Sequence, residues 1–65
     1  MKRVVFTVKY YTTDNSIEEK NFFKPASMII DYNACEAFKK NCITHCSKLD
    51  NFRELMTAFY EEIEL

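Results

Sequence analysis

The chain has 65 residues, of which 48% are hydrophobic and 15% aromatic, and its formal net charge is −1. This apolar content excludes a disordered tail, and the near-neutral charge provides no global attraction to nucleic acid or to an anionic membrane. A chain this short buries only about 60% of the surface that its unfolded form exposes. We therefore expect residues 1–65 to form one marginally stable domain, which gains stability from a partner or from a second copy of itself.

Alternation is the clearest signal in the first third of the chain. From Arg3 to Thr12, apolar and β-branched residues alternate between two faces, which predicts a first strand. The segment Ile17–Lys24 predicts a second strand, ended by Pro25, which cannot donate a ladder hydrogen bond. Asp14 and Asn15 between them favour a turn, since both tolerate left-handed backbone geometry.

A two-residue turn at Asp14-Asn15 would fix the pairing of this hairpin. Phe6 would then face Phe23, and Thr7 would face Phe22 on the other side. This register predicts that Phe22 and Tyr11 share the outer face.

Two helix-start signals follow. Asn33 with Glu36 is similar to a capping box, and an apolar stripe predicts a helix that runs to about Lys48; the stripe comprises Cys35, Phe38, Cys42, Cys46 and Leu49. Asn51 and Glu54 repeat the signal and predict a last helix, whose apolar face comprises Phe52, Leu55, Met56, Phe59 and Ile63. The stretch Ala26–Tyr32 fits either a short third strand or an extension of the first helix, and a strand or a turn is the favoured interpretation. The predicted fold is α+β: a β-hairpin, with a three-stranded antiparallel sheet as the alternative, packed against two C-terminal antiparallel helices.

Cysteine placement favours a reducing compartment. Cys35 and Cys42 would lie about 10 Å apart on the helix, beyond the roughly 7 Å Cα separation that a disulfide allows. Cys42 and Cys46 would be close enough, but their Cα–Cβ bonds would run parallel along the helix, which does not suit a disulfide. Free thiols are typical of a reducing compartment, and no apolar run approaches the roughly 18 residues of a membrane span. We expect a cytoplasmic protein that has no membrane partner.

Cys42, His45 and Cys46 have a spacing that zinc ligands could use. A structural zinc site requires a fourth ligand, which the chain does not supply nearby, and thiols on an apolar stripe also pack as small hydrophobes. Core packing is the favoured interpretation. The same residues offer no Cys–His catalytic pair with an orienting acid, and a chain without glycine has no phosphate-binding loop. We expect no cofactor, no metal and no enzyme activity.

Two surfaces are candidates for binding. The hairpin would expose Tyr11 and Phe22, aromatic residues of the kind enriched in interface cores, beside Lys9, Lys20 and Lys24. The last helix would end in an acidic group, Glu61, Glu62 and Glu64, which a basic partner could recognise.

These patterns predict a small protein-interaction module, an accessory or inhibitor protein of the kind that phages and mobile elements encode. Its partner would be another protein or a second copy of the chain. The alternative is a small nucleic-acid-binding regulator, in which bases stack on the hairpin's aromatic rings between the lysines.

Overall fold

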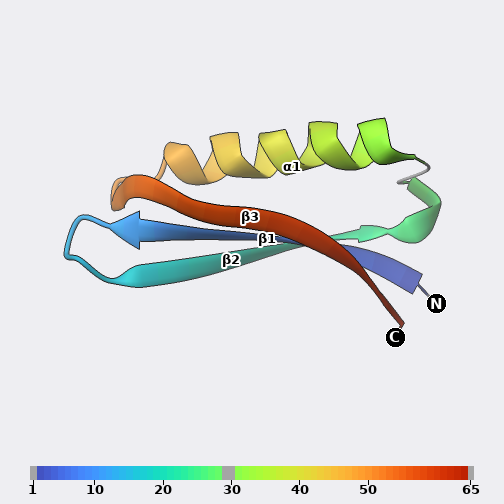
Figure 1. The fold of residues 1–65 in the computed structure, drawn as a ribbon, viewed down its shortest axis with the longest axis horizontal. Coiled ribbons are helices and arrows are strands. Elements are labelled where there is room, and N and C mark those ends of the chain that lie inside the picture. The colour runs from blue at the N-terminus through green and yellow to red at the C-terminus, as the bar shows by residue number, and fades with distance from the viewer. Residues whose placement is uncertain (1, 29–30, 65) are drawn as a thin grey trace.

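The computed structural model describes residues 2–28 and 31–64. Three strands and one α-helix make up most of this part of the chain (Figure 1). In chain order the elements are β1 (Lys2–Thr12), β2 (Ile17–Pro25), a 3-10 turn (Ala26–Met28), α1 (Tyr32–Ser47) and β3 (Phe52–Glu64). The predicted α+β class is therefore confirmed.

The three strands form one antiparallel sheet in the order β2-β1-β3. Helix α1 lies along one face of this sheet, and the described chain leaves the opposite face uncovered (Figure 1). Side chains of β1 that point towards α1 form the core together with two helix cysteines; these buried residues are Val4, Phe6, Val8, Tyr10, Cys42 and Cys46. Phe6 packs edge-to-face on Phe38 of α1, with ring centroids 4.6 Å apart.

The hairpin register differs by one residue from the prediction. Phe22, not Phe23, stands opposite Phe6. The reason is a three-residue loop, in which the backbone N–H of Thr12 donates to Ser16 at 2.8 Å and Asn15 adopts a φ of 68°. A three-residue hairpin loop ends in such a left-handed residue, and a shift of one residue moves every side chain of β2 to the other face.

The predicted last helix is wrong, because residues 52–64 form strand β3. β3 pairs with the free edge of β1 from Lys2 to Thr12. A hairpin alone is marginally stable and leaves the backbone groups at the outer edge of each strand unpaired. Pairing β3 with β1 completes the ladder of the central strand, and this long-range hydrogen bonding outweighs the local helical pattern.

Two irregularities explain why β3 looked helical. Pairing steps from Lys9↔Thr57 to Tyr10↔Leu55, and from Tyr11↔Glu54 to Thr12↔Phe52. Met56 and Arg53 are therefore extra residues on the bulged strand. The bulge at Arg53 places Phe52 and Leu55 three residues apart on one face, whereas regular alternation places Phe59 and Ile63 four residues apart on the other face. Together these spacings imitate those of a helix.

The helix α1 begins two residues before the predicted position. Its N-cap is Asp31, whose carboxylate accepts from the backbone N–H of Ala34 at 2.8 Å; Asn33 lies within the first turn. Ala26–Met28 form a 3-10 turn, which agrees with the expected turn and not with a short strand or a helical extension. Ile29 and Ile30, the rest of that predicted strand, lie outside the described residues.

Candidate functional site

The face of the sheet opposite α1 is the candidate site, and we call it the open face. Its membership follows from the cross-strand pairs, because paired residues share a face. β1 contributes Val5, Thr7, Lys9 and Tyr11, β2 contributes Ile17, Glu19, Asn21 and Phe23, and β3 contributes Thr57, Phe59, Glu61 and Ile63.

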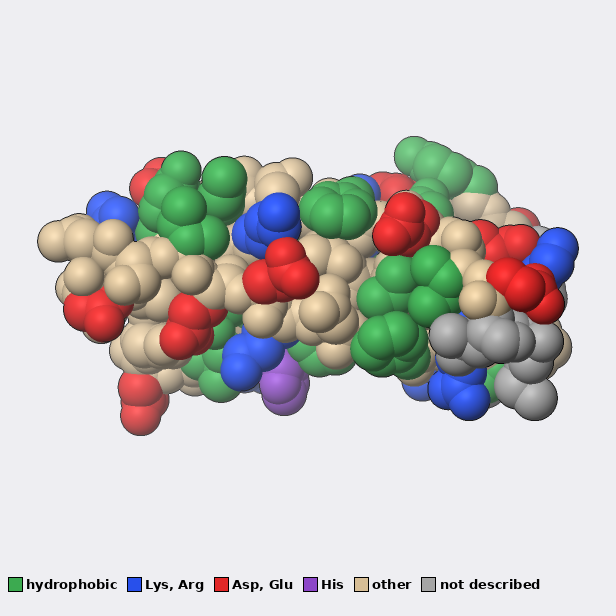
Figure 2. Space-filling view, turned by 90° about the horizontal axis from the view of Figure 1, so that it is seen from below, with side chains coloured by type: hydrophobic (Ala, Val, Ile, Leu, Met, Phe, Trp, Pro, Cys, Tyr) green, Lys and Arg blue, Asp and Glu red, His purple; other side chains and the backbone are tan. Residues whose placement is uncertain are grey.

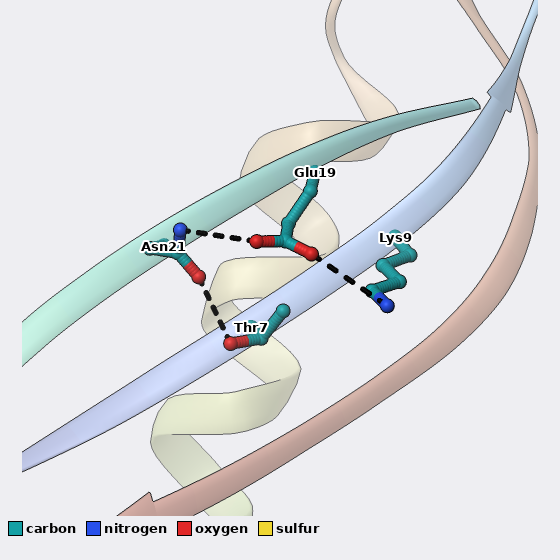
Figure 3. Close-up of polar contacts among 4 residues, drawn as sticks. All are labelled: Thr7, Lys9, Glu19 and Asn21. Carbon is teal, nitrogen blue, oxygen red and sulfur yellow. Dashed lines mark hydrogen bonds and ion pairs between the residues drawn. The ribbon is translucent and has the colours of Figure 1, made fainter. Parts of the chain in front are cut away.

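A polar chain crosses the middle of the open face (Figure 3). The Thr7 hydroxyl donates to Oδ1 of Asn21 at 2.9 Å, and Nδ2 of Asn21 donates to Glu19 at 3.3 Å. Glu19 in turn forms an ion pair with Nζ of Lys9 at 3.6 Å. These contacts satisfy the polar groups among themselves, which lowers the cost of covering them with a partner.

Apolar side chains lie on either side of this polar chain. Phe23 is 52% exposed and Phe59 43% exposed, and both flank the buried Thr7 and Val5 of the central strand. Towards the hairpin loop, Ile17 is 55% exposed and stands opposite Tyr11. Figure 2 shows hydrophobic groups towards both ends of this face, with charged side chains among them. Such apolar exposure on one side of a sheet is typical of an interaction surface.

Tyr11 is held in place on the open face by a cation. The guanidinium of Arg53 lies 5.5 Å from the Tyr11 ring centroid, and its Nε donates to the carbonyl of Thr12 at 3.2 Å. Arg53 is the extra residue of a bulge in β3, and bulges redirect side chains in this way. The contact fixes an aromatic ring at one end of the candidate site.

The structure separates the residues that the sequence grouped as binding candidates. Tyr11 and Lys9 lie on the open face together with Glu61. The prediction that Phe22 shares this face is wrong: Phe22 packs against the core on the α1 side, and Lys20 shares its side of β2. Lys24 also lies there, with Nζ 4.8 Å from the Phe38 ring centroid.

The acidic group is not the end of a helix. Glu61 lies opposite Val5 on the open face, whereas Glu62 lies opposite Val4 on the α1 side and forms an ion pair with Lys2 at 3.3 Å. Glu64 lies opposite Lys2. The predicted acidic patch is thus divided between the two faces of the sheet.

The cysteines lie where core packing predicts them. Cys42 is 3% exposed and Cys46 fully buried, and all three thiols are free. Burial raises the pKa of Cys42 to about 11, with the Cys46 thiol adding to the shift and the Lys24 ammonium opposing it. The His45 ring packs edge-to-face on the Phe22 ring, with ring centroids 5.6 Å apart. Within residues 2–28 and 31–64, no three His, Cys, Asp or Glu side chains gather as metal ligands would.

The chain has no match among protein-family models, curated proteins or solved structures. No helix of the described chain is long and apolar enough to cross a membrane. The functional argument therefore depends on the geometry of the open face and its surroundings.

The sequence analysis did not place Ile17, Phe23 and Phe59 together on the open face. A three-residue loop at residues 13–15 would have placed Phe23 and Ile17 correctly, because Asn15 suits the left-handed position that closes such a loop. Phe59 required recognition of β3 as a strand, for which the run from Thr57 to Tyr60, rich in β-formers, was the available signal.

Proposed function

We propose that this chain is a non-enzymatic protein-interaction module, an accessory or inhibitor protein that binds another protein through the open face. The observation that carries the proposal is the exposure of Phe23, Phe59 and Ile17 on the side of the sheet that α1 does not cover. A partner that covers these side chains gains roughly 25 cal/mol for each Å² of apolar surface removed from water.

The composition of the open face also supports a protein partner. Aromatic side chains supply large contact areas, and the internally paired chain from Thr7 to Lys9 supplies polar contacts without unpaired charge. Interfaces of this kind combine apolar anchors with satisfied polar groups. A nucleic-acid regulator that uses all three hairpin lysines on one face has less support, because Lys9 lies on one face and Lys20 and Lys24 on the other.

The proposal is tested by capture of partners from the source organism with the wild-type chain and with a variant that carries Phe23→Asp and Phe59→Asp. Both side chains are exposed, so the variant should fold, which circular dichroism checks. We expect it to lose the partner that the wild-type chain retains. Tyr32→Asp is the matched control, because Tyr32 is 68% exposed at the start of α1, away from the open face.

Sedimentation of the purified chain distinguishes binding of a different protein from binding of a second copy of the chain. If a second copy covers the open face, the wild-type chain is a dimer and the double Phe→Asp variant a monomer. Retention of every captured partner and of any dimer by that variant would contradict the proposal.

A further inference from the structure

A second surface lies at the edge of the sheet, where β2 meets α1. A pocket of about 200 Å³ opens there, lined by Phe22, Phe38, Asn41, Cys42 and His45. Two phenylalanine rings and the Cys42 side chain form its apolar part, and the Asn41 amide and the His45 imidazole are its polar groups. The volume suits one ring-sized side chain, because pockets for whole drug-sized ligands are larger, about 300–1,000 Å³.

The surroundings of this pocket are cationic. Lys20 and Lys24 precede and follow Phe22 on the α1 side of β2. Among the described residues neither lysine forms an ion pair with a carboxylate. None of the residues that line the pocket is acidic. Glu18, the acid on the same side of β2, accepts hydrogen bonds from Tyr10 and Asn51, and the charge of Lys20 also contributes to lowering its pKa. Glu18 therefore offsets part of the Lys20 charge, and Lys24 is not among the causes of that pKa shift.

The edge beside the pocket can accept another strand. β1 is the only strand that pairs with β2 in the described chain, so the other edge of β2 has no strand beside it. An added strand would lie about 4.8 Å beyond β2, and every second side chain would point towards the α1 side. One of those side chains would stand at the pocket, and its neighbours would stand near Lys20 and Lys24.

We propose that the β2 edge and this pocket bind an extended acidic segment of a partner protein, with an aromatic or large aliphatic side chain in the pocket and carboxylates at Lys20 and Lys24. The site is separate from the open face. Single-stranded nucleic acid fits less well, because its backbone cannot pair with a strand edge, the pocket admits one ring rather than a row of bases, and the chain carries a net charge of −1.

Selection from a display library of random nine-residue peptides tests this site. We expect the selected peptides to carry acidic residues on both sides of one aromatic or aliphatic residue. Lys20→Glu and Asn41→Trp, which fills the pocket from an exposed position, should each weaken binding of a selected peptide about tenfold or more. Lys40→Glu is the matched charge control on the exposed side of α1 and should leave the affinity within about twofold.

Three outcomes would overturn the inference. If the selected peptides show no acidic bias, the lysines have no role in binding. If the peptides bind the Lys20→Glu and Asn41→Trp variants normally but do not bind the Phe23→Asp variant, binding takes place on the open face alone. Binding of a labelled oligo(dT) that Lys20→Glu abolishes, with no peptide selected, would assign the surface to nucleic acid. The open-face variant should bind the selected peptides with unchanged affinity, even if it loses the captured partner. The two proposals can therefore fail independently.

Discussion

The hydroxyl of Tyr10 donates to Oε1 of Glu18 at 2.8 Å, and Nδ2 of Asn51 donates to the same oxygen at 2.9 Å. This carboxylate thereby joins the central strand, the edge strand β2 and the turn before β3. The two hydrogen bonds lower the pKa of Glu18, with the bond from Tyr10 as the larger cause.

Removal of the Tyr10 hydroxyl should weaken the fold without disturbing its core. We expect Tyr10→Phe to lower the free energy of unfolding by about 1 kcal/mol, because the buried ring keeps its packing on Phe52 while one hydrogen bond is lost. Urea denaturation measures the change. Tyr11→Phe is the control, since no hydrogen bond of the Tyr11 hydroxyl is seen among the described residues. Equal stabilities for Tyr10→Phe and the wild-type chain would mean that water replaces Glu18 at no cost.

Alkaline pH should destabilise the protein through buried groups whose pKa the fold raises: Tyr10, Cys42 and, in the same direction, Cys46. Burial, reinforced by Glu18, raises the pKa of Tyr10 from 10.0 to about 12, and burial raises the pKa of Cys42 from 9.0 to about 11. A raised pKa in the folded state gives stability that is complete below the unfolded pKa and is lost as the pH rises through the folded pKa. The urea midpoint should therefore stay level up to about pH 9 and fall between about pH 9 and pH 12.

Two variants assign the parts of this pH profile. Cys42→Ala should reduce the lower part of the decline, where Cys46 also ionises, and Tyr10→Phe should reduce the upper part, because each removes one titrating group. A wild-type midpoint that is unchanged up to pH 11 would show that neither group is protected from ionisation in the fold.

Alternation was sufficient to predict β1 and β2, and the apolar stripe was sufficient for α1. Register was not predictable from the same signal, because loops of two and three residues both fit Thr13–Ser16 and differ in the backbone conformation of Asn15. That single residue decided whether Phe22 or Phe23 lies on the open face, so Tyr11 was expected there correctly and Phe22 was not.

Strand β3 could not be predicted from periodicity. The bulges at Arg53 and Met56 shift its pattern, and the stabilising partner, the free edge of β1, lies about 50 residues earlier in the chain. Local propensity cannot include such a contact. Lys24 lies near an aromatic ring, but that ring is Phe38 of α1 rather than the expected Tyr11. Lys20 and Lys24 share the α1 side of β2 because of the observed register, which the alternation of the sequence did not determine.

The cysteines should differ sharply in reactivity. Cys35 is half-buried, whereas Cys42 and Cys46 lie in the core. A thiol reagent such as dithionitrobenzoate should therefore modify one thiol of the folded protein and three in urea, because only the accessible thiolate reacts. Burial also raises the pKa of Cys35, so its reaction should be slower than that of a free thiol.

Cys35→Ser provides the check for this labelling. The folded variant should show almost no fast reaction and should release two thiols in urea. Rapid modification of Cys42 in the folded chain would mean that α1 separates readily from the sheet.

Asn15 should control the stability of the hairpin. Its φ of 68° lies in the left-handed region, where most residues with a Cβ are strained and glycine is not. We expect Asn15→Ala to lower the free energy of unfolding by about 1 kcal/mol and Asn15→Gly to leave it nearly unchanged. Thr13→Ala in the same loop is the control, because its backbone hydrogen bond to Asn51 is kept. Equal losses of unfolding free energy for the alanine and glycine variants would show that the Asn15 side chain, rather than its backbone conformation, stabilises the loop. The left-handed backbone at Asn15 would then not determine the register that places Phe22.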